Sequence, residues 1–307
     1  MKIACIGEVM IELVAHKGEQ ANLATIGIAG DSYNTAAYLS MLAQNSDIEV
    51  SYITALGQDT FSDRIFSEIQ SRGINTNLIE RRQDTIPGIH AVETDEHGER
   101  TFTYWRGQAA AKTLFQEPCE ITFDALYDFD LVYLSGISVA ILPPTTRTNL
   151  IAFLKDYKKR GGKVAYDSNY RPRLWPDKNT AKELNTKMWA LADIAFPSVD
   201  DEMLLFEDKD EAAVLQRLKE TGVTFGALKR GAEGPLPISS EANAPANNTP
   251  VYEKVTKVVD TTAAGDSFNA GFLYQYANGA NLDDALQAGH SLASKVIQAS
   301  GAIVDIK

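Results

Sequence analysis

The segment Asp260-Thr261-Thr262-Ala263-Ala264-Gly265-Asp266-Ser267-Phe268 constrains the fold and the chemistry of this chain more than any other. A polar, β-branched approach ends in three small residues, and the residues from Ser267 onward have the composition of a helix. Small residues at a helix start leave its backbone N–H groups open to an anion, and the helix dipole favours negative charge there. We therefore predict an anion hole formed by the backbone amides of Ala263, Ala264 and Gly265.

Asp266 follows this turn directly, and an anion site is an unfavourable place for a negative charge. The position makes sense for a base that takes a proton from a hydroxyl group while that hydroxyl attacks phosphorus. The alternative is an ordinary first-turn carboxylate that interacts favourably with the helix dipole. We take Asp266 as the candidate catalytic base.

The composition excludes several classes of protein. The chain has 307 residues, and 29 Lys and Arg against 41 Asp and Glu give a net charge of −12, which argues against general binding to nucleic acid or anionic membranes. A local arginine cluster can still bind an anionic small molecule. Cys5 and Cys119 show neither metal-binding spacing nor a disulfide framework, which predicts a reducing compartment. Because no stretch is long and apolar enough to span a bilayer, we expect a cytoplasmic protein without membrane or nucleic-acid partners.

Short apolar runs that end at a glycine or a polar residue alternate along the chain with segments of helical spacing. This alternation predicts an α/β fold in which helices cover a mostly parallel sheet. Asp31 and Asp210 precede two of the helical segments, and aspartate is a residue that caps helix N-termini. The predicted strands are 3–6, 50–56, 131–135, 163–167, 194–196 and 224–229, and the predicted helices are 32–43, 61–72, 143–160, 211–221 and 282–300.

Two segments break this alternation, Met10–Ala15 and Ile86–Trp105, because apolar and polar residues alternate there with a period of two. Thr94–Gly98 has the composition of a turn, so the second segment predicts a hairpin. A half-buried hairpin inserted into an α/β fold should form a small separate layer. The pattern leaves open whether that layer covers a ligand or is an edge hairpin without a moving part.

Residues 260–268 resemble the C-terminal signature of the ribokinase-like (PfkB) carbohydrate kinases, with Ala263 at a position where glycine is usual. Further segments similar to the family, in its order, are Ile3–Glu8, Gly30–Asn34 (with Ala29 where glycine is usual), Gly57–Asp59 and Lys229–Gly234. The resemblance covers residues 1–307 as one domain. It implies a three-layer ribokinase-like fold, with lid strands inserted at about 10–16 and 86–106 that close over the sugar.

Two arginines from distant segments indicate the class of substrate. Arg106 ends the predicted hairpin, and Arg171 follows the strand that ends at Asp167, at the sheet edge where α/β folds bind ligands. Two guanidinium groups and the Tyr104 hydroxyl suit the carboxylate of a sugar acid, which a guanidinium binds bidentately. The alternatives are a solvated charge for Arg106 and an ion pair with Asp167 or another acid for Arg171. The arrangement resembles the branch of the family that phosphorylates 2-keto-3-deoxygluconate.

The resemblance also implies sugar-binding residues at the start of the first long helix. In the family, the positions of Gly30, Asp31 and Asn34 hold sugar hydroxyl groups. Helix capping by Asp31 is the alternative, and capping is compatible with ligand binding.

The nucleotide side of the expected site is similar to two family motifs. Lys229, Gly231 and Gly234 resemble the adenine-side loop, although a left-handed turn would also require glycine at 231. Ser198 stands where the family has the asparagine of an Asn-x-x-Glu motif that supports magnesium and phosphate. Glu202 is a candidate for binding metal-bound water, or an ordinary first-turn carboxylate.

The resemblance implies ATP-dependent phosphorylation of the C6 hydroxyl of a sugar acid of the 2-keto-3-deoxygluconate type. Neutral sugars and nucleosides are alternative substrates, and a non-catalytic sugar-acid sensor is an alternative of another class. The family also implies Mg²⁺, allows a monovalent cation, and suggests a dimer that pairs through its lids. The sequence contains no Gly-x-x-x-x-Gly-Lys-[Ser/Thr], and no Gly-x-Gly-x-x-Gly follows its first strand, which argues against P-loop and dinucleotide-binding folds.

Overall fold

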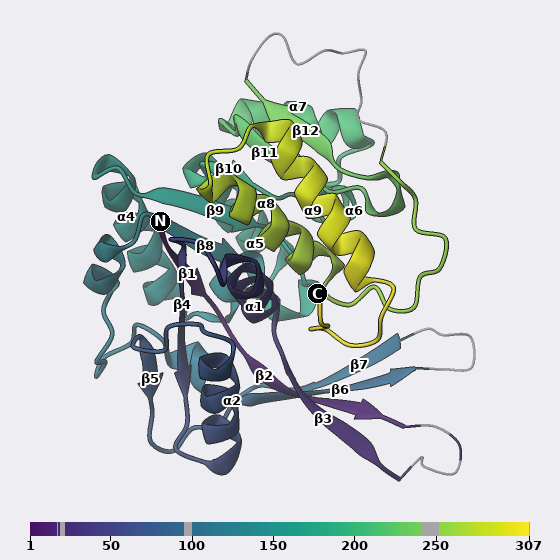
Figure 1. Ribbon diagram of the computed structural model, residues 1–307. Coiled ribbons are helices and arrows are strands. Elements are labelled where there is room, and N and C mark those ends of the chain that lie inside the picture. The colour runs from purple at the N-terminus through teal and green to yellow at the C-terminus, as the bar shows by residue number, and fades with distance from the viewer. Residues whose placement is uncertain (17, 19–21, 95–99, 241–251, 307) are drawn as a thin grey trace.

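The computed structural model describes residues 1–306 apart from 17, 19–21, 95–99 and 241–251. The larger of its two sheets runs through the centre of the molecule (Figure 1) and has eight strands in the order β12-β11-β10-β9-β8-β1-β4-β5. All neighbouring strands run parallel except β11 and β12, as the alternation of strands and helices predicts. The strands are β1 (Lys2–Ile6), β4 (Glu49–Leu56), β5 (Ile79–Arg81), β8 (Leu131–Ser135), β9 (Lys163–Asp167), β10 (Ile194–Ala195), β11 (Phe225–Leu228) and β12 (Leu236–Ser239).

The second sheet, which we call the lid sheet, extends from one end of the body in the order β3-β2-β6-β7. The predicted hairpin is confirmed as the antiparallel pair β6 and β7, and the turn expected at 94–98 lies almost wholly outside the described residues. The lid strand β3 was not predicted, because glycine interrupts it, and the short strands β5 and β12 of the large sheet were not predicted either. A Cβ on Gly27 would lie 3.1 Å from the Glu12 carboxylate, so this glycine makes room for a buried acid on the neighbouring strand. The lid strands are β2 (Met10–Ala15), β3 (Ala24–Ala29), β6 (Gly88–Thr94) and β7 (Arg100–Trp105).

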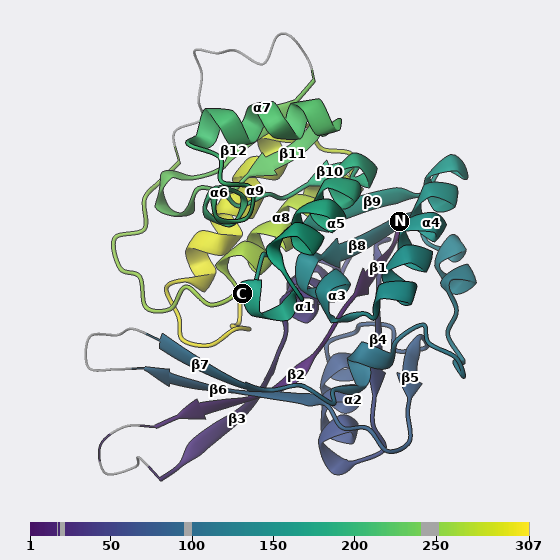
Figure 2. The ribbon, with the colours of Figure 1, turned by 180° about the vertical axis from the view of Figure 1, so that it is seen from behind.

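Helices cover both faces of the large sheet (Figures 1 and 2), and the side chains of β1 show why. Ala4 and Ile6 pack into one apolar cluster while Ile3 and Cys5 pack into the other, because successive strand residues point to opposite faces. None of the described helices is long and apolar enough to cross a membrane. One face carries α1 (Asp31–Ala43), α2 (Thr60–Ser71), α8 (Ala264–Ala277) and α9 (Leu282–Val296), and the other α3 (Gly136–Ile141), α4 (Pro144–Lys159), α5 (Lys178–Leu191), α6 (Val199–Phe206) and α7 (Glu211–Thr221).

The helix ends confirm one predicted cap and correct another. At the start of α7, the Asp210 side chain accepts a hydrogen bond from the Ala213 amide at 2.8 Å. Capping by Asp31 is wrong, because α1 begins at Asp31 itself and Gly30 is the cap residue without a side-chain hydrogen bond. Glycine is required there because a Cβ would lie 2.3 Å from the Glu8 carbonyl oxygen. The Asp31 carboxylate is therefore available for the site described next.

Candidate active site

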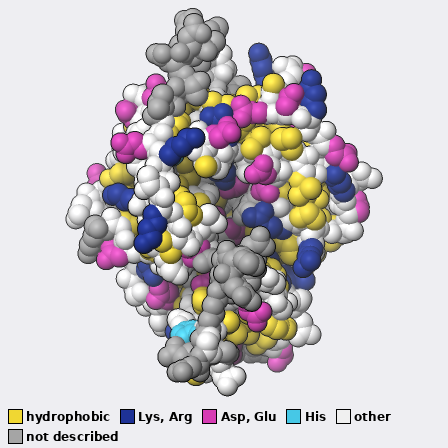
Figure 3. Space-filling model, turned by 90° about the vertical axis from the view of Figure 1, so that its right-hand side faces the viewer, with side chains coloured by type: hydrophobic (Ala, Val, Ile, Leu, Met, Phe, Trp, Pro, Cys, Tyr) yellow, Lys and Arg dark blue, Asp and Glu magenta, His cyan; other side chains and the backbone are white. Residues whose placement is uncertain are grey.

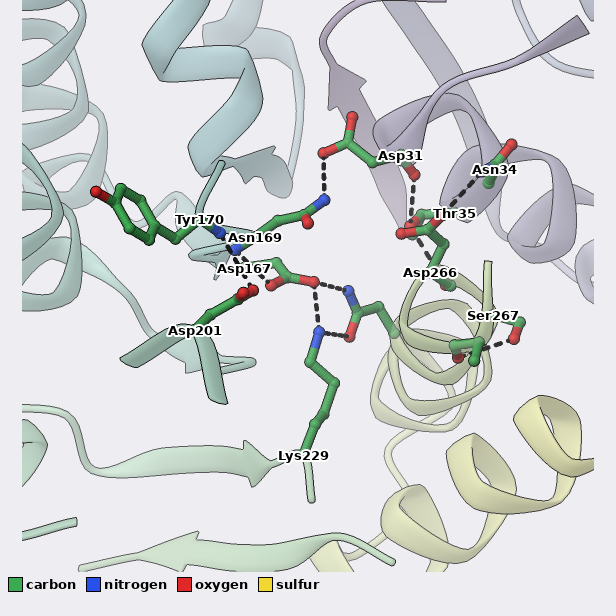
Figure 4. A network of polar contacts seen from close by, with 12 residues as sticks. Asp31, Asn34, Thr35, Asp167, Asn169, Tyr170, Asp201, Lys229, Asp266 and Ser267 are labelled. Carbon is green, nitrogen blue, oxygen red and sulfur yellow. Dashed lines mark hydrogen bonds and ion pairs between the residues drawn. The ribbon is translucent and has the colours of Figure 1, made fainter. Parts of the chain in front are cut away.

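The carboxyl ends of the central strands and the N-termini of α1 and α8 meet at one edge of the large sheet (Figure 4). Two helix N-termini directed to one place favour the binding of an anion. Figure 3 views the side where the lid sheet meets the body, with acidic and basic side chains next to one another around the hollow between them. Figure 4 shows that residues from five distant segments meet in one polar network, namely Asp31, Asp167, Asp201, Lys229 and Asp266.

The predicted anion turn precedes α8. The Ala264 amide donates to the Thr261 carbonyl at 3.2 Å, so this amide is already engaged. Within the described part of the chain the amides of Ala263, Gly265 and Asp266 have no such partner, and they form the open part of the turn. The open set therefore overlaps the predicted one but replaces Ala264 by Asp266.

Two features hold this turn in place. The Asp260 carboxylate accepts hydrogen bonds from the amides of Thr262 at 2.8 Å and Gly301 at 2.7 Å, which ties the turn to the segment after α9. Ala263 adopts the left-handed conformation with φ of 59°, which costs an L-residue roughly 1–2 kcal/mol. The backbone is thus held in a conformation that glycine would adopt without strain, at the position where the family signature has glycine.

Asp266 lies in the first turn of α8 and faces α1. Its carboxylate accepts a hydrogen bond from Asn34 Nδ2 at 2.8 Å. Burial raises the pKa of Asp266 to about 8, and the negative charges of Asp31 and Asp167 add to the rise. The hydrogen bond from Asn34 and the charge of Lys229 lower the pKa in part. A carboxyl group with a pKa this close to the working pH is suited to act as a general base.

Asp167 forms a second cluster beside Asp266. Its carboxylate is buried and accepts from Lys229 Nζ at 2.5 Å, from Asn269 Nδ2 at 2.6 Å and from the Asn169 amide at 3.1 Å. Sequence reasoning used Asp167 to mark a strand end and as a possible partner of Arg171, and it missed Asn269. The available signal was the spacing from Asp266, because residues three apart lie on the same face of a helix.

The opposite wall of the site is formed by the segment after β9. Asn169 Nδ2 donates to the Asp31 carboxylate at 2.8 Å, which joins this segment to the start of α1. The Asn169 backbone is left-handed, with φ of 31°, and such strain persists where surrounding contacts determine it. Asp31 and Asn34, both predicted to bind sugar hydroxyls, thus line one mouth, and each already contacts a second site residue. Gly30, the third residue predicted there, has no Cβ, and this lets its backbone lie close to that of Glu8.

Arg106, predicted to bind a carboxylate, lies where β7 ends and pairs with Glu8, which follows β1. Glu8 is 1% exposed, and burial raises the pKa of its carboxyl, against the lowering effect of Arg106. The pair is incompletely satisfied, because Glu8 Oε1 and Arg106 Nε are buried without a hydrogen-bond partner among the described residues. Tyr104 is exposed, and its ring centre lies 5.8 Å from the guanidinium carbon. Sequence reasoning missed the role of Glu8, whose signal is a carboxylate directly after a buried strand.

Arg171, the other predicted carboxylate ligand, forms an ion pair with an acid of the chain, which is the alternative that the sequence left open. Its guanidinium pairs with Asp201 at 3.3 Å rather than with Asp167, and its side chain is 51% exposed. Burial raises the pKa of Asp201, while Arg171 lowers it. Asp201 also accepts from the Tyr170 amide at 3.2 Å, so it fixes the chain around Arg171.

The predicted nucleotide-binding residues lie in two places. Lys229 and Ser198 lie at the strand ends beside the polar network, and Gly231 and Gly234 lie in the turn that follows. Lys229 was grouped with an adenine-side loop, but its side chain points to Asp167 and the anion turn (Figure 4). Ser198 lies opposite Lys229 in an isolated bridge between the ends of β10 and β11. Gly231 and Gly234 have φ of 56° and 80°, so the turn itself requires glycine at both positions.

Glu202, proposed for metal-bound water, forms its ion pair with Arg217 rather than with Lys229 or Arg171. It is fully buried, and Oε2 pairs with Arg217 at 2.9 Å, while Arg217 also binds Asp208. The preceding residue, Asp201, faces the network instead, because successive helix residues point in different directions. No group of three or more His, Cys, Asp or Glu side chains among the described residues could hold a metal ion directly.

Comparison with known proteins extends this description. A model of the pfkB family of carbohydrate kinases matches residues 1–307. The 2-dehydro-3-deoxygluconokinase of Dickeya dadantii is 43% identical over 306 residues, which cover 99% of this chain and 97% of that protein. The 2-dehydro-3-deoxygluconokinase of Escherichia coli is 42% identical over 304 residues, with 99% and 97% covered. More distantly, a protein named probable fructokinase-6 of Arabidopsis thaliana is 25% identical over 316 residues, with 98% and 78% covered.

Solved structures share the fold at low sequence identity. A PfkB protein from Polaromonas superposes with a TM-score of 0.80 at 20% identity, covering 97% of this chain and 95% of that one. A fructokinase with bound ATP from Xylella fastidiosa has a TM-score of 0.80 at 21% identity, with 98% and 93% covered. The eight-stranded sheet, its two helix layers and the separate small sheet are thus the ribokinase-like architecture that the sequence predicts.

Proposed function

The chain belongs to the pfkB family of carbohydrate kinases, and from this we propose that it transfers the terminal phosphoryl group of ATP to the C6 hydroxyl of 2-keto-3-deoxy-D-gluconate. This compound is the substrate in the names of the relatives that are 40–43% identical along the full chain. The observation that carries the chemistry is Asp266, held by Asn34 beside the open amides at the start of α8.

In the proposed mechanism, Asp266 accepts the proton of the C6 hydroxyl as its oxygen attacks phosphorus. The open amides of Ala263 and Gly265, together with the Asp266 amide, donate to the oxygens of the phosphoryl group as charge develops on them. Asn34 fixes the carboxylate that receives the proton. Asp31 is placed to accept a hydrogen bond from a sugar hydroxyl near the same mouth.

The carboxylate end of the sugar acid is assigned to the lid. Arg106 Nε is a buried donor without an acceptor among the residues that the structure describes, and a substrate carboxylate would supply that acceptor. Tyr104 and Arg171 are exposed and complete this end. The opposing observation is that each arginine already pairs with an acid of the chain, Glu8 or Asp201. This observation keeps a neutral sugar, as in a fructokinase, as the second candidate substrate.

Magnesium is expected to enter with the nucleotide. The carboxylates of Asp167 and Asp201 accept hydrogen bonds from the protein, and no described cluster fits a directly bound metal ion. Bound to the phosphates, Mg²⁺ would neutralise charge on ATP. A monovalent cation is left as an expectation of the family.

Three properties of the whole protein belong to this proposal. We treat the chain as one kinase domain with the lid sheet inserted at about 10–16 and 86–106. A dimer through the lids is supported by exposed apolar side chains on and beside the lid sheet, namely Leu23, Ile86 and Trp105. The cytoplasm is the proposed compartment, in keeping with two free cysteines.

The test is an assay of ATP turnover with 2-keto-3-deoxygluconate, fructose, ribose and a nucleoside, with the product identified by ³¹P NMR. The proposal predicts a 6-phosphate of the sugar acid and kcat/KM at least tenfold above that for any neutral sugar. A preference for fructose or ribose would replace the substrate assignment by the second candidate. Binding of the sugar acid without ATP turnover would instead indicate the non-catalytic sensor.

A further inference from the structure

Lys229 reaches across the large sheet to a buried acid. It follows β11, and its backbone pairs with Pro197 and Val199 at the end of the two-residue strand β10. Because β10 lies between β11 and β9, the Lys229 side chain passes over the end of β10 to reach Asp167 at 2.5 Å. Only 13% of this side chain is exposed. A buried ion pair of this kind contributes little net stability, so its position calls for another explanation.

The acid that holds Lys229 is itself fixed from α8. Asp167 is almost fully buried and accepts a hydrogen bond of 2.6 Å from Asn269, whose Nδ2 also contacts the Tyr133 hydroxyl at 3.0 Å. Asn269 Oδ1 lies 3.5 Å from Lys229 Nζ. Because Asn269 follows Asp266 by three residues, the helix that carries the base also determines where the lysine charge lies.

The lysine charge lies at the mouth of the anion turn. A Cβ on Gly265 would be 3.4 Å from Lys229 Nζ, so the absence of a side chain leaves the path from the ammonium group to the Gly265 amide open. The same charge lowers the pKa of Asp266. An ammonium group here adds a full positive charge to a cradle otherwise made of backbone N–H dipoles.

We propose that Lys229 is a catalytic residue that binds the phosphoryl group during transfer, and that Asp167, fixed by Asn269, is the residue that positions it. The proposal deepens the proposed function and rests on it. In the step, the bond from phosphorus to the sugar oxygen forms and the bond to the leaving ADP oxygen breaks. The hydroxyl proton goes to Asp266, and Lys229 keeps its protons and acts only through charge and hydrogen bonding.

The first measurement compares Lys229→Met with the wild type, using the phosphorylated sugar as the readout. Loss of one preorganised donor to a transition-state oxygen typically lowers kcat by roughly 10²–10³-fold, and we expect a loss in this range. Binding of the sugar without nucleotide, followed by calorimetry, should stay within about threefold, because Lys229 faces the phosphate side. Lys229→Arg keeps the charge and should recover part of kcat. Lys163→Met, at the exposed opposite end of β9, is the matched control and should leave kcat unchanged.

A loss of kcat in an Asp167 variant could come from damaged structure as well as from a misplaced Lys229. A double-mutant cycle separates the two causes. Asp167→Asn should lower kcat in the wild-type background and have little further effect in Lys229→Met. Additive losses in the cycle would contradict the positioning role of Asp167.

A double variant checks that a loss of kcat does not come from misfolding. Lys229→Met leaves Asp167 buried with an unpaired charge, whereas the double variant with Asp167→Asn removes both charges together. A folded double variant with low kcat supports the proposal, and one with kcat within threefold of the wild type overturns it. If the wild type phosphorylates only a neutral sugar, the substrate assignment fails, and the same variants still test Lys229 on that sugar.

Discussion

The reacting end of the site and its lid end differ in how far their polar groups are satisfied. At the reacting end, the Asp167 carboxylate accepts three hydrogen bonds and Asp266 is held by Asn34. At the lid end, the buried pair of Glu8 and Arg106 leaves one oxygen and one nitrogen without a partner in the described part of the chain. A buried polar atom left unpaired costs about 1–3 kcal/mol, so the two ends are built on different principles.

This difference assigns different tasks to the two ends. A network whose side chains are already held in place without ligand is preorganised, and it needs no rearrangement when charge develops in the transition state. A half-satisfied ion pair gains most when a ligand supplies the missing partner. We therefore expect changes at the reacting end to affect turnover and changes at the lid end to affect substrate binding.

The largest expected effect is at the reacting end. Asp266→Asn keeps the size of the side chain but removes the proton acceptor, and turnover should fall by roughly 10²–10⁴-fold. Sugar binding, measured by calorimetry, should persist. Turnover close to the wild-type value would remove Asp266 from the role of base and with it the comparison between the two ends.

The next effect is at the lid end. Arg106→Ala should raise KM for the sugar acid by about 10- to 150-fold, corresponding to about 1.5–3 kcal/mol for a charge-assisted contact in a closed site. The effect on kcat should be smaller, because the carboxylate lies far from the reacting hydroxyl. Arg171→Ala should give a smaller rise, because Arg171 is half-exposed and already paired with Asp201.

The matched control for these variants is Arg160→Ala, whose side chain is 61% exposed in a surface pair with Asp156. It should leave both KM and kcat unchanged. An unchanged KM in both site variants, with a wild type that prefers neutral sugars, would mean that Arg106 and Arg171 serve only their ion pairs.

The third effect is on the pH dependence of kcat/KM, which tests Asp266 at the reacting end. Asp266 acts as a base only when it is deprotonated, and its pKa is raised to about 8. Below that value kcat/KM, which reports the free enzyme, should fall about tenfold per pH unit, and above it the profile should level off. Asn34→Ala removes a hydrogen bond that lowers the pKa, so its profile should move to higher pH. Asn278→Ala, at the far end of α8, is the control that should not shift it.

The same two regions show what sequence reasoning can reach. The turn before α8, the place of Asp266 in its first helical turn and the hairpin of β6 and β7 were predictable, because neighbouring residues determine their local geometry. The pair of Glu8 and Arg106 spans 98 residues, and that of Asp167 and Asn269 spans 102. Contacts of this separation depend on the topology of the sheet, so they became visible only in three dimensions.

The fold shows the same limit in its helices. The buried positions of α5 include Asn185, which bonds the Tyr166 hydroxyl at 2.7 Å, so apolar spacing did not reveal this helix. The helix predicted at 282–300 ends at Val296, because the chain turns there and Ile297 accepts hydrogen bonds from Val259 and Asp260. Tertiary contacts thus overrode the local pattern in both cases.

The fourth effect concerns stability. A carboxyl group with a raised pKa in the folded state favours folding most below its unfolded pKa and opposes it increasingly up to its folded pKa, here about 8. Asp266→Asn should therefore melt above the wild type at pH 8, by about 2 °C or more, and this advantage should shrink toward pH 5. A variant that melts below the wild type at pH 8 would show that the hydrogen bond from Asn34 outweighs the cost of the buried charge.

The smallest effect concerns Ala263, whose left-handed backbone stores strain at the reacting end. Ala263→Gly removes a cost of roughly 1–2 kcal/mol and adds about 0.5–1 kcal/mol of chain entropy, so the net gain should be about 1 kcal/mol or less. For a chain of this size the melting temperature should rise by about 2–4 °C at most. Ala264→Gly is the matched control, because Ala264 is helical and glycine there should destabilise by up to about 1 kcal/mol. Since both changes leave the amides of the turn open, kcat should stay within about threefold of the wild type. Opposite signs in melting with unchanged kcat would separate the strain at Ala263 from catalysis, whereas a large loss of kcat in Ala263→Gly would mean that the rigid alanine holds the amides in register.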